Sequence, residues 1–264
     1  MFREFFWFEL KFWLRGMMVW VFLGAVGLLM FGAVASDNVR VGVSSESTYR
    51  NAAHTIQLFY GVMSLLGGVI VTAFVNAAAC RDFTHQTAPY VFSYPIRKVP
   101  YLMGRFWAAA LIALIPMMGV SLGAILGSVM PWQEPERIGP TVWGAHLWGF
   151  AAIAVPNCLL VASLIFAIAV WTRSTVVSFL GMLAILIGYT IAGQLTRNLD
   201  YESLAGLLDP FAISLYESLT KYWTVSEMNT NYLALPTSLL WNRLLWLAVS
   251  GGILAVTVWR FSFT

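Results

Sequence analysis

The sequence predicts an all-α protein that crosses a membrane six times. Composition is the first reason: of 264 residues, 59% are hydrophobic and 10% are charged, whereas a soluble domain carries about 25% charged residues. A series of apolar blocks is the second, because roughly 20 apolar residues cross the hydrocarbon core as a helix. The third is a polar, basic run at residues 79–105 between two of these blocks, a bias typical of short cytoplasmic loops.

The first segment, residues 2–15, is predicted to be an elbow helix that lies in the membrane interface. At 100° per residue its charged side chains share one arc, and its aromatic side chains fill the opposite side, as in interfacial helices. The charged arc consists of Arg3, Glu4, Lys11 and Arg15.

Glu9 departs from this pattern, because it projects from the apolar side of the same helix. A carboxylate in that position is costly unless it is paired or neutralised. We therefore expect Glu9 to have a basic partner on the cytoplasmic side, either Arg105 or Arg97, and to hold the elbow helix in place. The alternative is that Glu9 lies among lipid headgroups.

Six apolar blocks follow and are predicted to be the membrane spans. The second block is rich in small residues that permit close helix packing, and Pro116 in the third block predicts a kink. The expected spans are Met17–Ala35, His54–Ala79, Leu102–Val129, Ala145–Trp171, Thr175–Leu195 and Thr237–Phe261.

An even number of spans places both termini on the same side. The basic N-terminus and the run at 79–105 put that side in the cytoplasm, with nine of the 15 Lys and Arg residues there and six outside. The run at 79–105 is expected to contain a short amphipathic coupling helix. An ordinary solvated loop with positive-inside charges is the alternative to a docking role.

The long segment 196–236 before the sixth span has a high apolar content for a linker. It is expected to fold against the outer membrane surface as one or two short helices, one of which begins at Asp209 and Pro210 with the Asp as cap. We interpret the segment as a structural lid, and contact with a substrate is the alternative.

Motifs for catalysis, metal binding and nucleotide binding are not found in the sequence. It contains no G-x-x-x-x-G-K-[ST], H-E-x-x-H or G-x-S-x-G string. The three histidines lie far apart, neither cysteine has a C-x-x-C neighbour, and no face collects enough Lys and Arg for nucleic acid. The polar side chains expected inside the spans are uncharged, chiefly Asn157, Gln194 and Asn76, and Asn157 is expected to hydrogen-bond across helices. We therefore expect neither an enzyme nor a nucleic-acid partner.

Several strings, taken in order, resemble the membrane subunit of type-2 ABC transporters (the ABC-2 permease family). The likeness covers essentially the whole chain and is closest to large bacterial members whose permease is often fused to an M1-type aminopeptidase. The strings are Phe8-Glu9-Leu10-Lys11-Phe12-Trp13-Leu14-Arg15, Arg81-Asp82-Phe83, Tyr94-Pro95-Ile96-Arg97-Lys98, Tyr101-Leu102-Met103-Gly104-Arg105-Phe106, Asp209-Pro210-Phe211, Lys221-Tyr222-Trp223-Thr224-Val225, Asn229-Thr230 and Leu240-Trp241-Asn242-Arg243-Leu244.

The resemblance implies a single transmembrane domain over residues 1–264, in the bacterial inner membrane. It would form one half of a twelve-helix unit with a second, identical or homologous, six-helix half. Separate ATPase subunits would bind ATP and Mg and dock on the cytoplasmic loop between spans two and three, so no cofactor is expected in this chain. The sequence has no zinc motif, so a peptidase would be supplied by another polypeptide or be absent altogether.

The function expected from the resemblance is that of a permease that moves a substrate by alternating access. Two alternatives stay open: a non-transporting scaffold that acts with an outer-face partner such as a peptidase, and an ATP-independent channel or carrier. The residues expected at the ATPase contact are Arg81, Asp82, Phe83, Thr84, Pro95, Arg97, Lys98, Tyr101 and Arg105.

Overall fold

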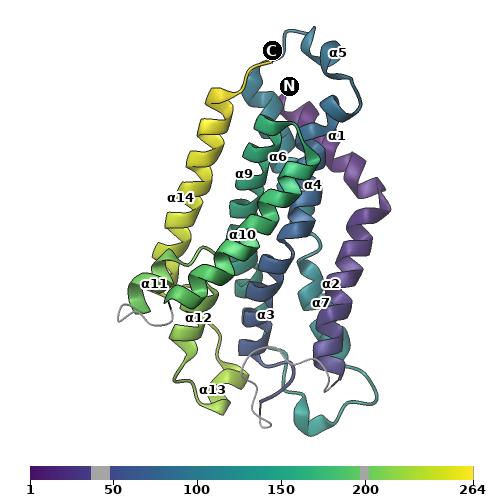
Figure 1. The fold of residues 1–264 in the computed structure, drawn as a ribbon. Helices are drawn as coiled ribbons and strands as arrows, with labels where there is room; N and C mark the ends of the chain where they lie inside the picture. The colour runs from purple at the N-terminus through teal and green to yellow at the C-terminus, as the bar shows by residue number, and fades with distance from the viewer. Residues whose placement is uncertain (37–47, 197–201, 264) are drawn as a thin grey trace.

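The helices of the computed structural model form an elongated bundle (Figure 1). The structure describes residues 1–36, 48–196 and 202–263, and every regular element within them is a helix, which confirms the predicted all-α class for that part of the chain. Both termini and α5 lie at one end of the bundle, called the terminal end below, and α13 lies at the other, distal end. The elements are α1 (Phe2–Arg15), α2 (Met17–Ala35), α3 (Ala53–Leu66), α4 (Gly68–Thr84), α5 (Ala88–Phe92), α6 (Lys98–Leu114), α7 (Met118–Ser128), the 3-10 turn η1 (Pro135–Arg137), α8 (Trp143–Trp148), the π-helical turn η2 (Gly149–Ala154), α9 (Val155–Thr172), α10 (Thr175–Thr196), α11 (Glu202–Leu208), α12 (Ile213–Thr220), α13 (Val225–Thr230) and α14 (Thr237–Arg260).

Several helices are long and apolar enough to cross a membrane, which indicates a multi-pass membrane protein. Within the described residues there are five such stretches, or six if the bent pair α3 and α4 counts as one span. The middle of the first connection, residues 37–47, and the start of the segment before the last span, residues 197–201, lie outside the described residues. The five stretches are Met17–Ala35, Lys98–Ser128, Trp143–Thr172, Thr175–Gln194 and Thr237–Arg260.

The stretch predicted as the second span, His54–Ala79, consists of two helices, because the chain bends by 45° between α3 and α4 at Gly67. A Cβ atom at Gly67 would overlap the side chain of Met117 and lie 2.5 Å from the carbonyl oxygen of Met63. Met117 itself lies in the break between α6 and α7, where Pro116 stands as predicted. The two breaks are therefore in contact, and only a glycine fits between them.

Helices α2 and α7 approach each other closely through glycines. Gly119, Gly123 and Gly127 are spaced four residues apart, so they share one face of α7, and that face lies against α2. A Cβ atom at Gly119 would lie 2.6 Å from the carbonyl oxygen of Leu23, and one at Gly123 would overlap the carbonyl oxygen of Gly27. Small residues at regular spacing allow this kind of backbone contact between membrane helices.

Helix α9 is the centre of the bundle, with α4, α6, α10 and α14 packed around it. Its sequence is apolar on all sides, as is typical of a buried helix. Helices α2, α10 and α14 lie at the periphery and expose apolar side chains such as Leu28, Leu183 and Val256. Such faces suit contact with lipid or with another membrane helix.

Residues 202–236, the described part of the segment before the last span apart from Thr196, form three short helices, α11 to α13, at the distal end of the bundle, where one or two were expected (Figure 1). The helix expected to begin at Asp209 and Pro210 begins instead at Ile213, so that boundary was predicted wrongly. The carboxylate of Asp209 accepts the backbone N–H groups of Phe211 and Ser214, and these bonds shape the turn that precedes α12.

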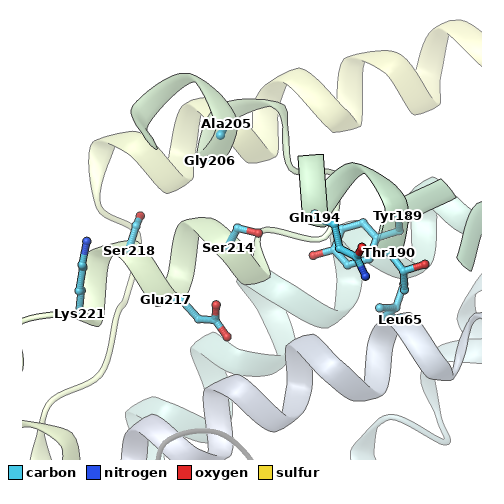
Figure 2. A pocket seen from close by; sticks show the side chains of 11 residues that line it. Leu65, Tyr189, Thr190, Gln194, Ala205, Gly206, Ser214, Glu217, Ser218 and Lys221 are labelled. Carbon is cyan, nitrogen blue, oxygen red and sulfur yellow. The ribbon is translucent and has the colours of Figure 1, made fainter. Parts of the chain in front are cut away.

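An open pocket with both apolar and polar walls lies between α10 and the segment α11–α12. Its volume is about 580 Å³, within the size range of ligand pockets. Figure 2 shows the surrounding side chains, which include Thr190 and Gln194 from α10, Ser214 and Glu217 from α12, and Lys221 just beyond its end.

The close contact between α2 and α7 predicts that one added methyl group on α7 lowers the stability of the protein. Gly123→Ala would push its Cβ into the backbone of α2, so we expect thermal unfolding in detergent at lower temperature, from a loss of about 1–3 kcal/mol. Gly24→Ala is the matched control on α2, because no atom lies within 4 Å of the added Cβ. Equal melting temperatures for the two variants would contradict this packing.

Candidate functional site

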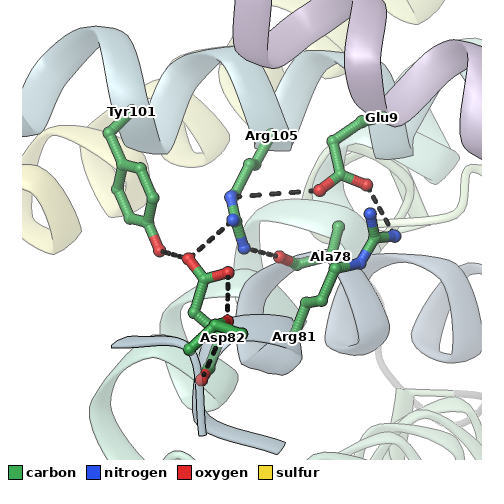
Figure 3. Close-up of polar contacts among 7 residues, drawn as sticks. Glu9, Ala78, Arg81, Asp82, Tyr101 and Arg105 are labelled. Atoms are coloured by element: carbon green, nitrogen blue, oxygen red, sulfur yellow. Dashed lines mark hydrogen bonds and ion pairs between the residues drawn. The ribbon is translucent and has the colours of Figure 1, made fainter. Parts of the chain in front are cut away.

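Buried charged side chains from three helices meet at the terminal end (Figure 3). Glu9 comes from α1, Arg81 and Asp82 from α4, and Tyr101 and Arg105 from α6. The four-residue spacing of Tyr101 and Arg105 places both side chains on one face of α6. We call these five residues the charge cluster.

Gly104 lets α1 pack directly on α6 beside this cluster. A Cβ atom there would lie 2.9 Å from the Cβ of Phe5 and 3.0 Å from the carbonyl oxygen of Phe2. Any larger residue would push α1 away from α6 and separate Glu9 from its partners.

Asp82 is the acceptor at the centre of the cluster. Its Oδ2 atom accepts from Nη2 of Arg105 at 2.6 Å and from the hydroxyl of Tyr101 at 2.7 Å. Arg105 also donates from Nη1 to the carbonyl oxygen of Ala78 at 2.8 Å, which ties α6 to α4 a second time. A carboxylate–guanidinium pair with further hydrogen bonds is the arrangement that makes a buried ion pair tolerable.

Glu9 fastens α1 to the same cluster. Its side chain is 1% exposed, and Oε2 lies 2.8 Å from Nη2 of Arg81, while Oε1 lies 3.9 Å from Nε of Arg105. The guanidinium of Arg81 also lies 4.0 Å from the centre of the Phe12 ring, so Arg81 contacts two side chains of α1, those of Glu9 and Phe12. Burial raises the pKa of Glu9 above its ordinary value, and the guanidinium groups of Arg81 and Arg105 oppose that rise.

The loop between α4 and α6 is anchored to the cluster by aromatic contacts. The ring of Phe92 in α5 lies 5.9 Å from that of Tyr101 and 4.9 Å from that of Phe263 near the C-terminus. Tyr90 and Tyr94 in the same loop are 76% and 71% exposed, so the anchored loop presents aromatic rings outward.

The structure divides the residues expected at an ATPase contact into two groups. Residues 79–84 continue α4 and residues 98–105 begin α6, so the exposed part of the segment is shorter than 79–105. Asp82, Tyr101 and Arg105 are buried, and Arg81 is largely enclosed. The remaining expected residues lie nearer the surface: Thr84, Pro95 and Arg97 are exposed, and Phe83 and Lys98 are half-buried.

Glu9 lies beside Arg81, which the sequence argument did not name as its partner. Arg105, which was named, is the more distant of its two cationic neighbours, and Arg97 is exposed on the loop. The helical period of α1 reveals that Glu9 is buried, but it carries no information about which cation lies opposite.

A second buried polar cluster lies near the distal end, and the sequence predicted only the hydrogen bonds of Asn157 across helices. Arg243, one of the six basic residues counted on the outer side, is buried in α14, where it is 3% exposed. Its guanidinium donates to Oδ1 of Asn157 in α9 at 2.7 Å and to Oδ1 of Asn242 at 2.6 and 2.9 Å. Asn242 in turn donates to the carbonyl oxygens of Gly206, Leu207 and Asp209, so this cluster fixes α11 on α14 and α9.

Comparison with known proteins adds no family to this geometry: no protein-family model and no curated protein matches the chain. A search of the described residues also finds no group of three His, Cys, Asp or Glu side chains placed to hold a metal ion. A functional assignment therefore rests on the charge cluster, the loop above it and the resemblance in sequence.

Removing one charge from the cluster predicts a measurable loss of stability. Arg81→Gln leaves the Glu9 carboxylate buried without its nearest cation, so we expect α1 to loosen and the protein to lose about 3 kcal/mol. Trypsin cleavage within residues 2–15 and thermal unfolding would measure the two effects. Glu9→Gln added to Arg81→Gln should recover most of the loss, because both partners are then neutral. No recovery in the double variant would contradict the pair.

The same pair predicts how the Arg81→Gln defect depends on pH. The pKa of Glu9 is raised in the folded state, so the contribution of this group to stability is present below its ordinary pKa of 4.5 and is lost as pH rises through the folded value. Arg81→Gln removes a cation that lowers this pKa. The loss of unfolding free energy caused by Arg81→Gln should therefore be smallest near pH 4 and should grow toward pH 8. Unfolding measured across that range tests this.

Arg97→Gln is the control for both experiments, because Arg97 is exposed on the same loop. Its stability difference from the wild type should stay flat with pH. A defect of Arg81→Gln that is independent of pH would show that Glu9 does not titrate against Arg81.

Proposed function

We propose that this chain is the membrane-spanning permease subunit of an ATP-binding-cassette transporter, driven by a separate ATPase that docks on the loop between α4 and α6. The observation that carries this proposal is the arrangement of the terminal end. A short loop with exposed aromatic and basic groups lies on a buried charge cluster that joins α1, α4 and α6. A force applied to such a loop reaches three helices at once.

The contact with the ATPase would be made by the exposed members of the loop, chiefly Thr84, Pro95, Arg97 and the half-buried Lys98. The cluster beneath would have a positioning role, because its residues are enclosed. Lys98 donates to the carbonyl oxygen of Trp259 at 3.2 Å, so the loop is also connected to the end of α14.

Movement of the terminal end would be transmitted to the breaks at Gly67 and Met117, where α3 meets α4 and α6 meets α7. Interrupted helices offer places at which two halves of a span change their relative angle. The ATPase would have to bind one arrangement more tightly than the other, because a partner that is indifferent to the two states shifts neither.

A second six-helix half, identical or homologous, would complete the path for the substrate. The apolar outer faces of α2, α10 and α14 are surfaces that such a half or lipid would cover. In this assembly both termini and the docking loop would face the cytoplasm of a bacterial cell, and ATP and Mg would be bound by the partner.

Charge reversal on the loop tests the docking role. Arg97→Glu with Lys98→Glu should leave membrane insertion and melting temperature near the wild type, and it should reduce by tenfold or more the amount of a P-loop ATPase that co-purifies with the chain from native membranes. Mass spectrometry and ATP hydrolysis by the purified complex would measure that amount.

Arg3→Glu with Arg260→Glu is the matched control, since both residues are exposed at the same end of the bundle but lie outside the loop. Equal ATPase recovery in all three proteins would reject the loop as the docking site. Transport by reconstituted vesicles separates a permease from a non-transporting scaffold: ATP-dependent uptake supports the permease, and an ATPase complex without uptake supports the scaffold.

A further inference from the structure

An open groove lies in the angle where α1 turns into α2, and it shares the Phe12 ring with Arg81 of the charge cluster. Its volume is about 610 Å³. Phe8, Phe12 and Trp13 of α1 and Met18 of α2 supply apolar walls, and Lys11 and Arg15 supply two cations. The turn itself is made at Gly16, whose backbone is extended between the two helices.

The charge of the groove is positive. Lys11 and Arg15 are four residues apart, so their side chains emerge from the same face of α1, and both are exposed. The guanidinium of Arg81 lies behind the Phe12 wall, 4.0 Å from the ring centre. Among the described residues no acidic side chain lines the groove, and Glu4 lines the neighbouring hollow together with Lys11.

The apolar walls continue into a surface that faces outward along the span. Met17, Met18 and Val21 of α2 are 79%, 60% and 60% exposed, and α2 runs from the terminal end along the length of the bundle (Figure 1). A molecule seated in the groove would therefore meet cations at the level of α1 and an apolar surface along α2.

We propose that the angle between α1 and α2 is a binding site for an anionic phospholipid. The phosphate group would lie against Lys11 and Arg15, and an acyl chain would pass Phe12 and Met18 and follow α2. A free anion would leave the aromatic walls and α2 unused, and a zwitterionic lipid would gain less from the two cations. The site is independent of the proposed transport function, because it needs no ATPase and no substrate.

Lipid titration of the delipidated full chain in a non-ionic detergent, followed by native mass spectrometry, tests this site. Dioleoylphosphatidylglycerol should bind saturably and about tenfold more tightly than dioleoylphosphatidylcholine. Lys11→Gln with Arg15→Gln should lower the phosphatidylglycerol affinity by roughly tenfold or more, since each cation near a lipid surface contributes about 1 kcal/mol. The affinity for phosphatidylcholine should be unchanged.

Arg3→Gln with Arg260→Gln removes the same charge from the same end and should lower the affinity by less than threefold. An equal loss in this control, or equal binding of the two lipids, would overturn the proposal. Met18→Ser changes an exposed side chain on α2 and should weaken phosphatidylglycerol binding several-fold, and an unchanged affinity would overturn the acyl-chain path. Displacement of the lipid by an equal concentration of inorganic phosphate would reveal a plain anion site and would also overturn it.

Discussion

The terminal end depends on the balance of four buried charges. Two carboxylates and two guanidiniums leave water together, and the desolvation of each is offset by the opposite charges and by the hydrogen bonds from Tyr101 and to Ala78. Because Glu9, Asp82 and the two arginines belong to three different helices, the helices must be in register for any one charge to be tolerated. The packing of α1 on α6 at Gly104, the position of the loop on Tyr101 and the burial of Arg81 all follow from that requirement.

The distal end satisfies the same requirement in a different way. Arg243 is held by the amide oxygens of Asn157 and Asn242. The amide groups of those asparagines then bind backbone carbonyls and a serine hydroxyl, so the cation organises loop and helix ends. The two ends of the bundle thus contain polar clusters with different chemistry, ion pairs at one and amide–guanidinium bonds at the other. Between them lie apolar helices and the glycine contacts of α7.

Local patterns predicted the features that depend on local chemistry. The helical class, the apolar stretches, the break at Pro116 and the burial of Glu9 could each be found in a window of a few turns. The bend at Gly67 was not predicted, and Met117, which packs against Gly67, is distant in the sequence. For the same reason the sequence did not identify Arg81 as the partner of Glu9: the rotation of α4 about its axis is set by its packing on α6 and α9.

Met117 occupies the space that the missing side chain of Gly67 leaves free, and this contact couples two interrupted spans. A rotation at either interruption displaces the methionine and so changes the room available at the other. At the terminal end, α4 and α6 are already joined by the hydrogen bond between Arg105 and Asp82. The angle between α3 and α4 and the angle between α6 and α7 are therefore expected to change together, in one concerted step.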